Sequence, residues 1–293
     1  MNSHPPDYLD KHQVSQSFDR AAPIYEESAN LQKMVGDDLL ERIEWVKLTP
    51  RQIVDVGAGT ARISRALSLN YKKADMYIVD ISEQMIIEAS KKAPKWFSKQ
   101  HFICADAAQL PFIDDSVDLL ISNLMLQWCN DIPAVFAEFA RVLKPDGALF
   151  FSTLGPDTLK ELRQSWASVD NGKHVNHFLD MHDYGDALLR AGLINPVMDV
   201  DRLDFTYTEV KQLMTELKQI GAHNITAGRS RSLTGKEKFK AMLAAYEEYR
   251  SEEGLLPATY EVVYGYALGK RKIEKVSDAT PAAPVAVPIK FEF

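Results

Sequence analysis

The chain has 293 residues, 46% of them hydrophobic and 26% charged, which is the composition of a folded protein large enough to bury a core. Its net charge of -7 argues against broad nucleic-acid binding, which needs clustered lysine and arginine. No apolar stretch approaches the length that spans a membrane, and the first residues lack the pattern of a secretory signal. We therefore expect a cytoplasmic protein.

The first fifty residues are predicted to form a helical cap. Residues 12–47 carry apolar side chains at helical spacing, and Pro23 divides this region into at least two helices. Pro50 ends the segment. We therefore assign residues 1–50 to an N-terminal helical cap.

A regular alternation of strands and helices follows the cap. Short apolar runs predict fully buried strands at 52–56, 76–79, 101–104, 117–122 and 147–152. The stretches between them predict helices near 60–69, 83–92 and 132–143. Such alternation is typical of an α/β fold with a doubly wound, Rossmann-like, mostly parallel sheet.

The last part of the chain is predicted to complete this sheet. Helices are expected at 157–169, 181–191, 208–220 and 235–250, and further strands at 194–207 and 258–268. If the two strands pair, the residues between them form an insertion. The expected units are then a main domain (51–207 and 255–269), a helical insertion or lid before the last strand (208–254) and a disordered tail (270–293).

The two cysteines show no spacing that would bind a metal. Cys104 lies in an apolar run and Cys129 follows a tryptophan, without CxxC or Cys/His motifs. We expect both to be buried free thiols, and we predict no metal site.

The stretch IVDVGAGTARIS, residues 53–64, joins the first strand to a helix through two glycines. Gly57 and Gly59 let the backbone approach a ligand closely, at the carboxyl edge of a parallel sheet where ligands bind. Ala61 stands where the dinucleotide fingerprint has its third glycine, which disfavours a pyrophosphate ligand.

Three carboxylates follow or end successive strands. Asp80 can accept hydrogen bonds from two ribose hydroxyl groups, and Asp106 lies within reach of an adenine amino group. Asp55 precedes the glycines, where a carboxylate would repel a pyrophosphate but suits an ammonium or sulfonium group. One acid after a strand is often only a helix cap, but the set of three predicts a site for a cationic adenosine compound, S-adenosylmethionine.

These motifs resemble those of the class I S-adenosylmethionine-dependent methyltransferases. DVGAGTAR, IVDIS, CADAAQLPF and RVLKPDGALFFSTLG carry the resemblance, over residues 51–155. It implies a seven-stranded sheet whose last two strands are antiparallel to each other, in agreement with the two strands expected near the end of the chain.

The rest of the chain is similar to a narrower family, the malonyl-acyl-carrier-protein O-methyltransferases of biotin synthesis. The similar stretches are FDRAAPIYEESANLQ, HVNHFLDMHDYGDALLRAGLINPVMDVD, IGAHNITAGRSRSLTGK and LPATYEVVYGYALG. This resemblance extends to about residue 269 and implies methylation of the free carboxylate of a malonyl thioester, on acyl-carrier protein or coenzyme A. The methyl ester would prime pimeloyl synthesis.

Three alternatives remain open. The first is a methyltransferase for another small carboxylic acid or a quinone precursor. The second is a binding module that keeps the fold without catalysis, and the third is an NAD-dependent oxidoreductase, which Asp55 disfavours.

The resemblance also implies the residues that hold the cofactor. Asp55, Gly57 and Gly59 would contact its methionine part, Asp80 the ribose, Met85 and Asp106 the adenine, Asn123 the methyl group, and Tyr25 would close over it. Met85 could equally be a core residue.

No catalytic acid or base is predicted, because a malonyl carboxylate is already ionised at neutral pH. The histidines are accordingly interpreted as structural or solvent-facing. Alignment of the two reactants would lower the barrier by roughly 7–11 kcal/mol. A cation should compensate the buried substrate charge. Arg229 and Arg231 of the insertion are the candidates, with Arg229 preferred because Gly228 allows a tight turn before it.

Other residues of the insertion have two possible interpretations. Leu213, Met214 and Leu217 share one helical face that either lines the substrate slot or packs in the core. Arg231, Lys236, Lys238 and Lys240 form either a docking face for an acidic carrier protein or an ordinary solvated surface.

Overall fold

The computed structural model describes residues 8–94, 98–222 and 235–270. The strands are β1 (Gln52–Val56), β2 (Asp75–Asp80), β3 (Gln100–Cys104), β4 (Val117–Asn123), β5 (Leu143–Leu154), β6 (Ile194–Tyr207) and β7 (Leu256–Leu268). The helices are α1 (Lys11–Ala21), α2 (Tyr25–Ser28), α3 (Asn30–Glu44), α4 (Arg62–Asn70), α5 (Glu83–Lys91), α6 (Ile132–Val142), α7 (Lys160–Ala167), α8 (Met181–Ala191), α9 (Val210–Gln219) and α10 (Lys236–Tyr246), with short 3-10 helices η1 (Leu126–Trp128) and η2 (Glu247–Tyr249). Within these residues no helix has both the length and the apolar character needed to cross a bilayer.

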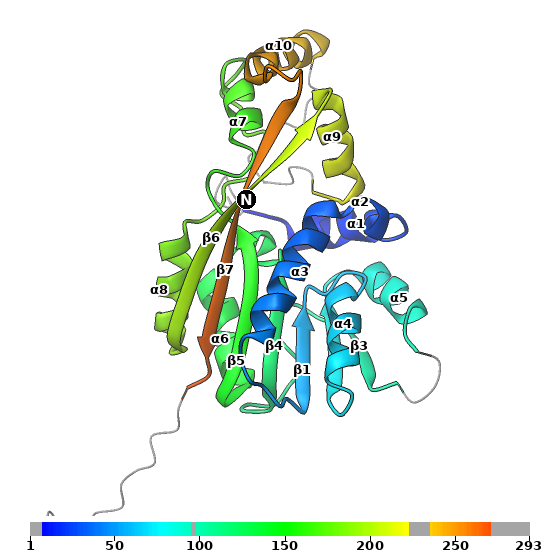
Figure 1. Ribbon diagram of the computed structural model, residues 1–293, viewed down its shortest axis with the longest axis vertical. Coiled ribbons are helices and arrows are strands. Elements are labelled where there is room, and N and C mark those ends of the chain that lie inside the picture. The colour runs from blue at the N-terminus through cyan, green and yellow to red at the C-terminus, as the bar shows by residue number, and fades with distance from the viewer. Residues whose placement is uncertain (1–7, 95–97, 223–234, 271–293) are drawn as a thin grey trace, which may run out of the picture.

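The seven strands form one sheet in the order β3-β2-β1-β4-β5-β7-β6 (Figure 1). All pairings among the first five strands, β1 to β5, are parallel, whereas β7 is antiparallel to β5 and to β6. The predicted fold class is confirmed, including the antiparallel last two strands and the helices inserted between them.

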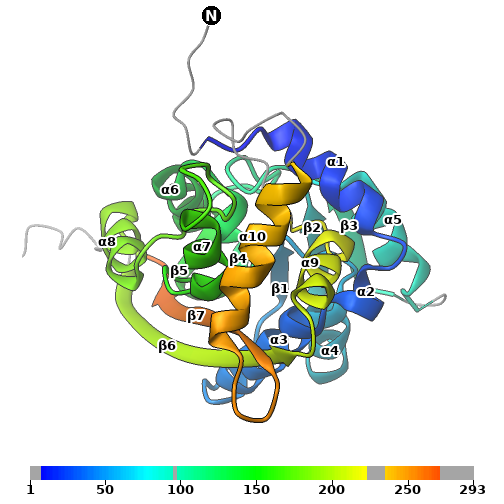
Figure 2. The ribbon, with the colours of Figure 1, turned by 90° about the horizontal axis from the view of Figure 1, so that it is seen from above.

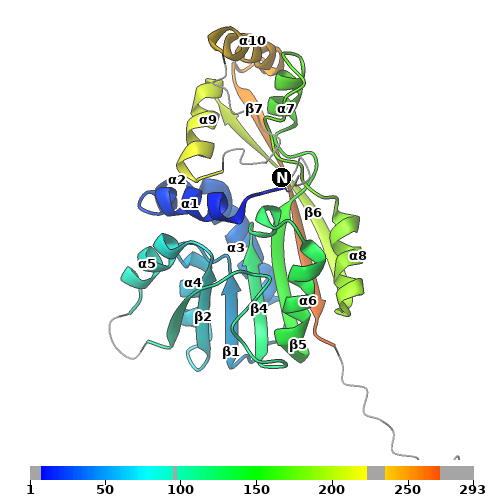
Figure 3. The same ribbon diagram turned by 180° about the vertical axis from the view of Figure 1, so that it is seen from behind.

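Helices cover both faces of the sheet. α3 and α4 lie on the face that Figure 1 shows, and α6 and α8 on the face that Figure 3 shows. Neighbouring residues of β1 point to opposite faces, so that Ile53 packs with the α3 side chains and Val54 with those of α6. Burial on both faces explains why the central strands read as continuous apolar runs.

The third strand is less buried than predicted. β3 forms an edge of the sheet, and none of its side chains is fully buried, since Gln100, Phe102 and Ile103 are partly buried and the other two are exposed. Cys104, at its end, is exposed and not buried as predicted, and Cys129 is only partly buried. An edge strand has a neighbour on one side only, so the apolar run in the sequence overestimates its burial.

The last two strands run beyond the rest of the sheet. β5 pairs with β7 as far as Leu154 and Val262, whereas β6 and β7 stay paired to Tyr207 and Leu256. This extension carries α7, α9 and α10, which lie over the carboxyl edge of the sheet (Figure 2). The buried Glu161 of α7 accepts hydrogen bonds from the backbone N–H and the hydroxyl of Thr259, which fixes α7 to β7.

The first two helices lie between the sheet and these upper helices (Figures 1 and 3). Asp19 of α1 accepts a hydrogen bond from the Ser82 hydroxyl at 2.6 Å, at the start of α5. Ser17 of α1 donates to the Gly221 carbonyl at 2.9 Å, just after α9. The cap is therefore bonded both to the sheet loops below it and to the inserted helices above it.

Candidate active site

The turn after β1 requires glycine for steric reasons. Gly57 and Gly59 adopt φ angles of 72° and 54°. A Cβ at Gly57 would lie 2.2 Å from Cγ of Met125, so no larger residue fits without a shift. The prediction that Ala61 replaces the third glycine of the dinucleotide fingerprint is wrong, because the spacing from Gly57 and Gly59 puts that position at Arg62, the first residue of α4. Ala61 nevertheless has a positive φ of 63°, so a third residue of this turn adopts a left-handed backbone.

Asp80 ends β2 with its carboxylate held by the backbone. Oδ2 accepts the N–H of Gly59 at 2.9 Å, and Oδ1 accepts the N–H of Ser82 at 2.8 Å. The group is buried, and burial raises its pKa to about 6. Each oxygen keeps lone-pair capacity, so the carboxylate can still accept two hydroxyl groups. This donor pattern fits the ribose role predicted for it.

Asp55 is a buried carboxylate without a cation. It is 1% exposed and accepts the Ser64 hydroxyl at 2.5 Å. Burial raises its pKa to about 6, and the charge of Asp80 contributes to the same direction. No ion pair reaches Asp55 from the part of the chain that the structure describes. An unpaired buried charge is costly, so this position suits a ligand that brings a positive charge.

A cavity of about 280 Å³ brings most of the predicted cofactor residues together. Its walls include Tyr25, Gly57, Gly59, Asp80, Met85, Asp106 and Asn123. Asp55 lines a smaller cavity of about 50 Å³ that shares Tyr25, both glycines and Asn123 with the first. The two together contain all eight residues, and their contacts with the cofactor stay a prediction.

Asp106, which is predicted to bind the adenine amino group, already has a cationic partner. Its carboxylate accepts the ammonium of Lys11, from α1, and the N–H of Ala108 at 3.0 Å. Lys11 lines the same cavity and was missed by the sequence reasoning. An adenine amino group at this carboxylate would therefore share it with Lys11.

A second cavity of about 1190 Å³ lies beside the first, under the inserted helices. Its apolar walls include Ile24, Leu31, Leu154, Leu159, Leu162, Phe178, Met214, Leu217 and Phe239. Phe18, Tyr25, Leu124 and Trp128 line both cavities, so the two meet at these side chains. The rings of Phe18 and Trp128 pack edge to face at 5.2 Å. Sequence reasoning missed both, although Phe18 lies in a stretch that carried the narrower resemblance.

The predictions for the inserted segment have mixed outcomes. Met214 and Leu217 line the large cavity, whereas Leu213 is 1% exposed in the core. Lys238 pairs with Asp170 and Lys240 with Glu237, so these two lysines are not free charges. Arg229 and Arg231 lie outside the described residues, and their role stays a prediction.

His174 was interpreted as structural or solvent-facing, and the structure places it on the wall of the large cavity. Its Nε2 lies 2.7 Å from the Asp170 carboxylate. Its ring stacks on Trp166 at 3.8 Å and 9°. The imidazole is thus oriented from two sides.

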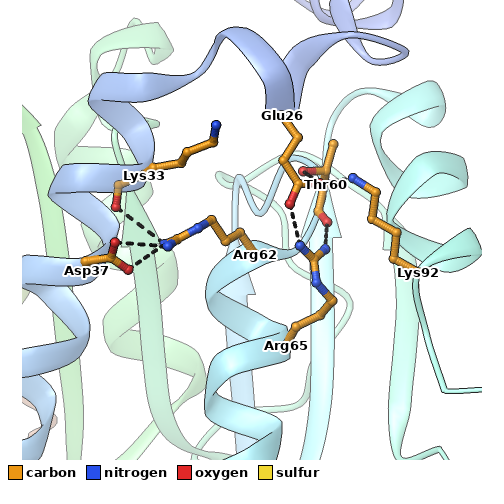
Figure 4. A network of polar contacts seen from close by, with 7 residues as sticks. All are labelled: Glu26, Lys33, Asp37, Thr60, Arg62, Arg65 and Lys92. Carbon is orange, nitrogen blue, oxygen red and sulfur yellow. Dashed lines mark hydrogen bonds and ion pairs between the residues drawn. The ribbon is translucent and has the colours of Figure 1, made fainter.

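Two arginines of α4 join the cap to the cofactor turn (Figure 4). Arg65 donates to Glu26 of α2 at 2.6 Å and to the Thr60 carbonyl, and Lys92 also pairs with Glu26. Arg62 holds Asp37 of α3 through both of its terminal nitrogens, at 2.6 and 2.9 Å. Tyr25, which lines all three cavities described above, directly precedes Glu26. These ion pairs therefore hold the segment that carries Tyr25.

We expect Glu26→Gln to speed cofactor release without unfolding the protein. The pairs are partly exposed, so their loss should cost at most about 1 kcal/mol of stability and raise the dissociation rate of S-adenosylmethionine roughly 3- to 10-fold. Stopped-flow tryptophan fluorescence, to which Trp128 on the wall of the cofactor cavity contributes, measures this rate. Glu27→Gln, an exposed neighbour on α2, is the control, and equal rates for the two variants would contradict the prediction.

Comparisons with known proteins place the chain among the methyltransferases. The model of the family described as "Methyltransferase domain" matches residues 54–151. Two curated proteins named malonyl-[acyl-carrier protein] O-methyltransferase are each 48% identical to this chain. The one from Gallionella capsiferriformans covers 88% of this chain and 91% of its own length, and the one from Laribacter hongkongensis covers 89% and 90%. The crystal structure of the YcgJ protein from Bacillus has a TM-score of 0.59 at 17% identity, over 80% of this chain and 99% of that one, and supports the fold alone.

The sheet order, the matching family model and the named relatives identify an S-adenosylmethionine-dependent methyltransferase with a Rossmann-like fold. Within that class, an identity of 48% over 88% of the chain decides the family. The chain belongs to the malonyl-[acyl-carrier protein] O-methyltransferase family.

Proposed function

We propose that this enzyme transfers a methyl group from S-adenosylmethionine to the free carboxylate of a malonyl thioester on acyl-carrier protein. The observation that carries the proposal is the 48% identity to relatives that bear this name. The cavities support it, because the two smaller ones are lined by the buried carboxylates of Asp80 and Asp55, which suit a cationic nucleoside, and the large one offers an apolar volume for an acyl thioester.

The residues around the smaller cavities fit the cofactor. Asp80 would accept the ribose hydroxyl groups, Asp55 would face the ammonium group of the methionine part, and Met85 and Asp106 would contact the adenine. When bound, S-adenosylmethionine supplies an electrophilic methyl group on a sulfonium. The chain itself binds and orients this group.

The substrate side requires orientation more than acid–base chemistry. A malonyl carboxylate has an ordinary carboxyl pKa and is ionised at neutral pH, so no residue has to remove a proton. Phe18, Tyr25 and Trp128, where the cavities meet, would exclude water from the reacting pair.

Three cations on the large cavity support a carrier-bound substrate. Arg20, Lys211 and Lys218 line this cavity, and none forms an ion pair with another residue in the described ranges. Their charges suit the phosphate of a phosphopantetheine arm or the acidic surface of a carrier protein. Coenzyme A carries the same arm, so the choice of carrier, like the cytoplasmic location and the place in biotin synthesis, stays a prediction.

Mass spectrometry of malonyl-acyl-carrier protein, after incubation with enzyme and S-adenosylmethionine, tests the proposal. We expect the carrier to gain the mass of one methyl ester. Acetyl-acyl-carrier protein, which has no free carboxylate, should remain unchanged. Methylation confined to free small acids or to a quinone precursor would instead support the alternative methyltransferase.

A further inference from the structure

Gln32, a partly buried residue near the start of α3, makes no side-chain hydrogen bond to any residue that the structure describes. Its Oε1 is shielded from solvent and accepts no hydrogen bond within these residues. Its Nε2 likewise makes no hydrogen bond to any residue that the structure describes. Carboxamide oxygens shielded from solvent normally accept a hydrogen bond, so one that accepts none requires an explanation.

The position of Gln32 points to the reaction site. It lines the large cavity and also the small cavity that contains Asp55, Gly57 and Gly59. Among the described residues, only Tyr25 also lines both of these cavities, and it lines the cavity of about 280 Å³ as well. Gln32 therefore stands between the predicted methionine site and the predicted substrate site.

The backbone of Gln32 is fixed by the sheet. Asn123, at the end of β4, donates from Nδ2 to the Gln32 carbonyl at 3.0 Å. The Asn123 Oδ1 accepts the Ser152 hydroxyl of β5 at 2.7 Å. This chain of bonds holds the first turn of α3 to the carboxyl ends of two strands, so the carboxamide is presented on a rigid support.

We propose that the Gln32 carboxamide binds and orients the carboxylate of the substrate for methyl transfer. Nε2 would donate to the carboxylate oxygen that does not react, which leaves the other oxygen free to attack the methyl group. The bond that forms joins this oxygen to the methyl carbon, and the bond that breaks releases its electron pair to sulfur. This inference rests on the proposed function, because it requires a carboxylate nucleophile.

A neutral donor suits this step for a chemical reason. A guanidinium such as that expected from Arg229 or Arg231 would compensate the overall charge of the substrate, but it would also withdraw part of the negative charge that must attack the methyl group. A carboxamide fixes the direction of the carboxylate while withdrawing less of its charge. Tyr25 can supply a second neutral donor, because burial and the charge of Asp80 raise the pKa of its phenol and keep it protonated.

Binding of two thioesters distinguishes this role from a merely structural one. The probes are malonyl-pantetheine and acetyl-pantetheine, measured by calorimetry on enzyme saturated with S-adenosylhomocysteine. Gln32→Leu should weaken malonyl-pantetheine about 10- to 100-fold and leave acetyl-pantetheine within about twofold. Gln32→Glu, which keeps the shape but adds a negative charge, should weaken malonyl-pantetheine further. Gln109→Leu is the control, because Gln109 is exposed and lines none of the three cavities.

The outcomes separate the inference from the function. If the wild type methylates malonyl-acyl-carrier protein while both Gln32 variants bind malonyl-pantetheine as it does, only the role of Gln32 is wrong. Equal losses for both thioesters would also overturn it, because they would indicate a general distortion of the cavity. If the wild type methylates no malonyl thioester at all, the proposed function fails and the inference fails with it.

Discussion

Asp55→Asn is expected to stabilise the ligand-free enzyme while weakening its affinity for S-adenosylmethionine. Burial without a cation raises the pKa of Asp55 from 3.8 to about 6, which corresponds to a cost of up to about 3 kcal/mol when the group is ionised. Asparagine has nearly the same shape, and its Oδ1 can still accept the Ser64 hydroxyl. The free energy of unfolding at pH 7.5 should therefore rise, in the range of about 1–3 kcal/mol.

The stability gain of Asp55→Asn over the wild type should increase with pH. The folded protein holds the Asp55 proton more tightly than the unfolded chain does, so the wild type loses stability as the pH rises from 3.8 to about 6. Above about pH 6 the full cost is present and constant. The advantage of Asp55→Asn should therefore be large at pH 7.5, smaller at pH 5, and absent below the unfolded pKa. Urea denaturation at a series of pH values measures it.

The affinity loss should depend on the amino-acid part of the ligand. If Asp55 faces the methionine ammonium, its variant should bind S-adenosylmethionine about 10- to 100-fold more weakly. Methylthioadenosine, which lacks that part, should bind the variant and the wild type equally. Asp186→Asn, at an exposed position on α8, is the control for removal of a carboxylate. Equal loss for both ligands would assign Asp55 to another part of the site.

The sequence predicts the sheet and the carboxylates because their signals are local. In the strand at residues 52–56, Ile53, Val54 and Val56 are apolar because both faces of the strand are buried. Asp55 and Asp80 stand near the carboxyl ends of such strands. The glycine turn can also be predicted from the sequence, because only a residue without Cβ fits beside Met125 at position 57. The left-handed backbone of Ala61, in contrast, has no such local signal, because alanine rarely adopts a positive φ.

The remaining site features depend on contacts between residues far apart in the chain. Lys11 meets Asp106 across 95 positions, and Asn123 meets Gln32 across 91. No local pattern marks such partners, because a lysine or a glutamine on an amphipathic helix is ordinarily solvated. The burial of β3 was overestimated for a related reason. The sequence does not show which strand lies at the edge of the sheet.

Gly57→Ala is expected to damage both stability and cofactor binding. The new Cβ would lie 2.2 Å from Cγ and 2.5 Å from Cβ of Met125, atoms too close to the backbone to move independently of η1. Overpacking and the positive φ of 72° together should cost about 2–4 kcal/mol. Because Met125 lines the cofactor cavity, a shift of η1 should also lower the affinity for S-adenosylmethionine at least tenfold.

Gly254→Ala separates the two parts of this cost. Gly254 has a similar φ of 80°, but a Cβ there meets nothing within 4 Å. Its substitution should cost only about 1 kcal/mol from backbone strain and leave cofactor affinity unchanged. The excess destabilisation of Gly57→Ala over Gly254→Ala, measured by urea denaturation, is then the part due to Met125. If the two variants lose the same stability, the turn tolerates a side chain, and the requirement for glycine at this position lies in the backbone angle alone.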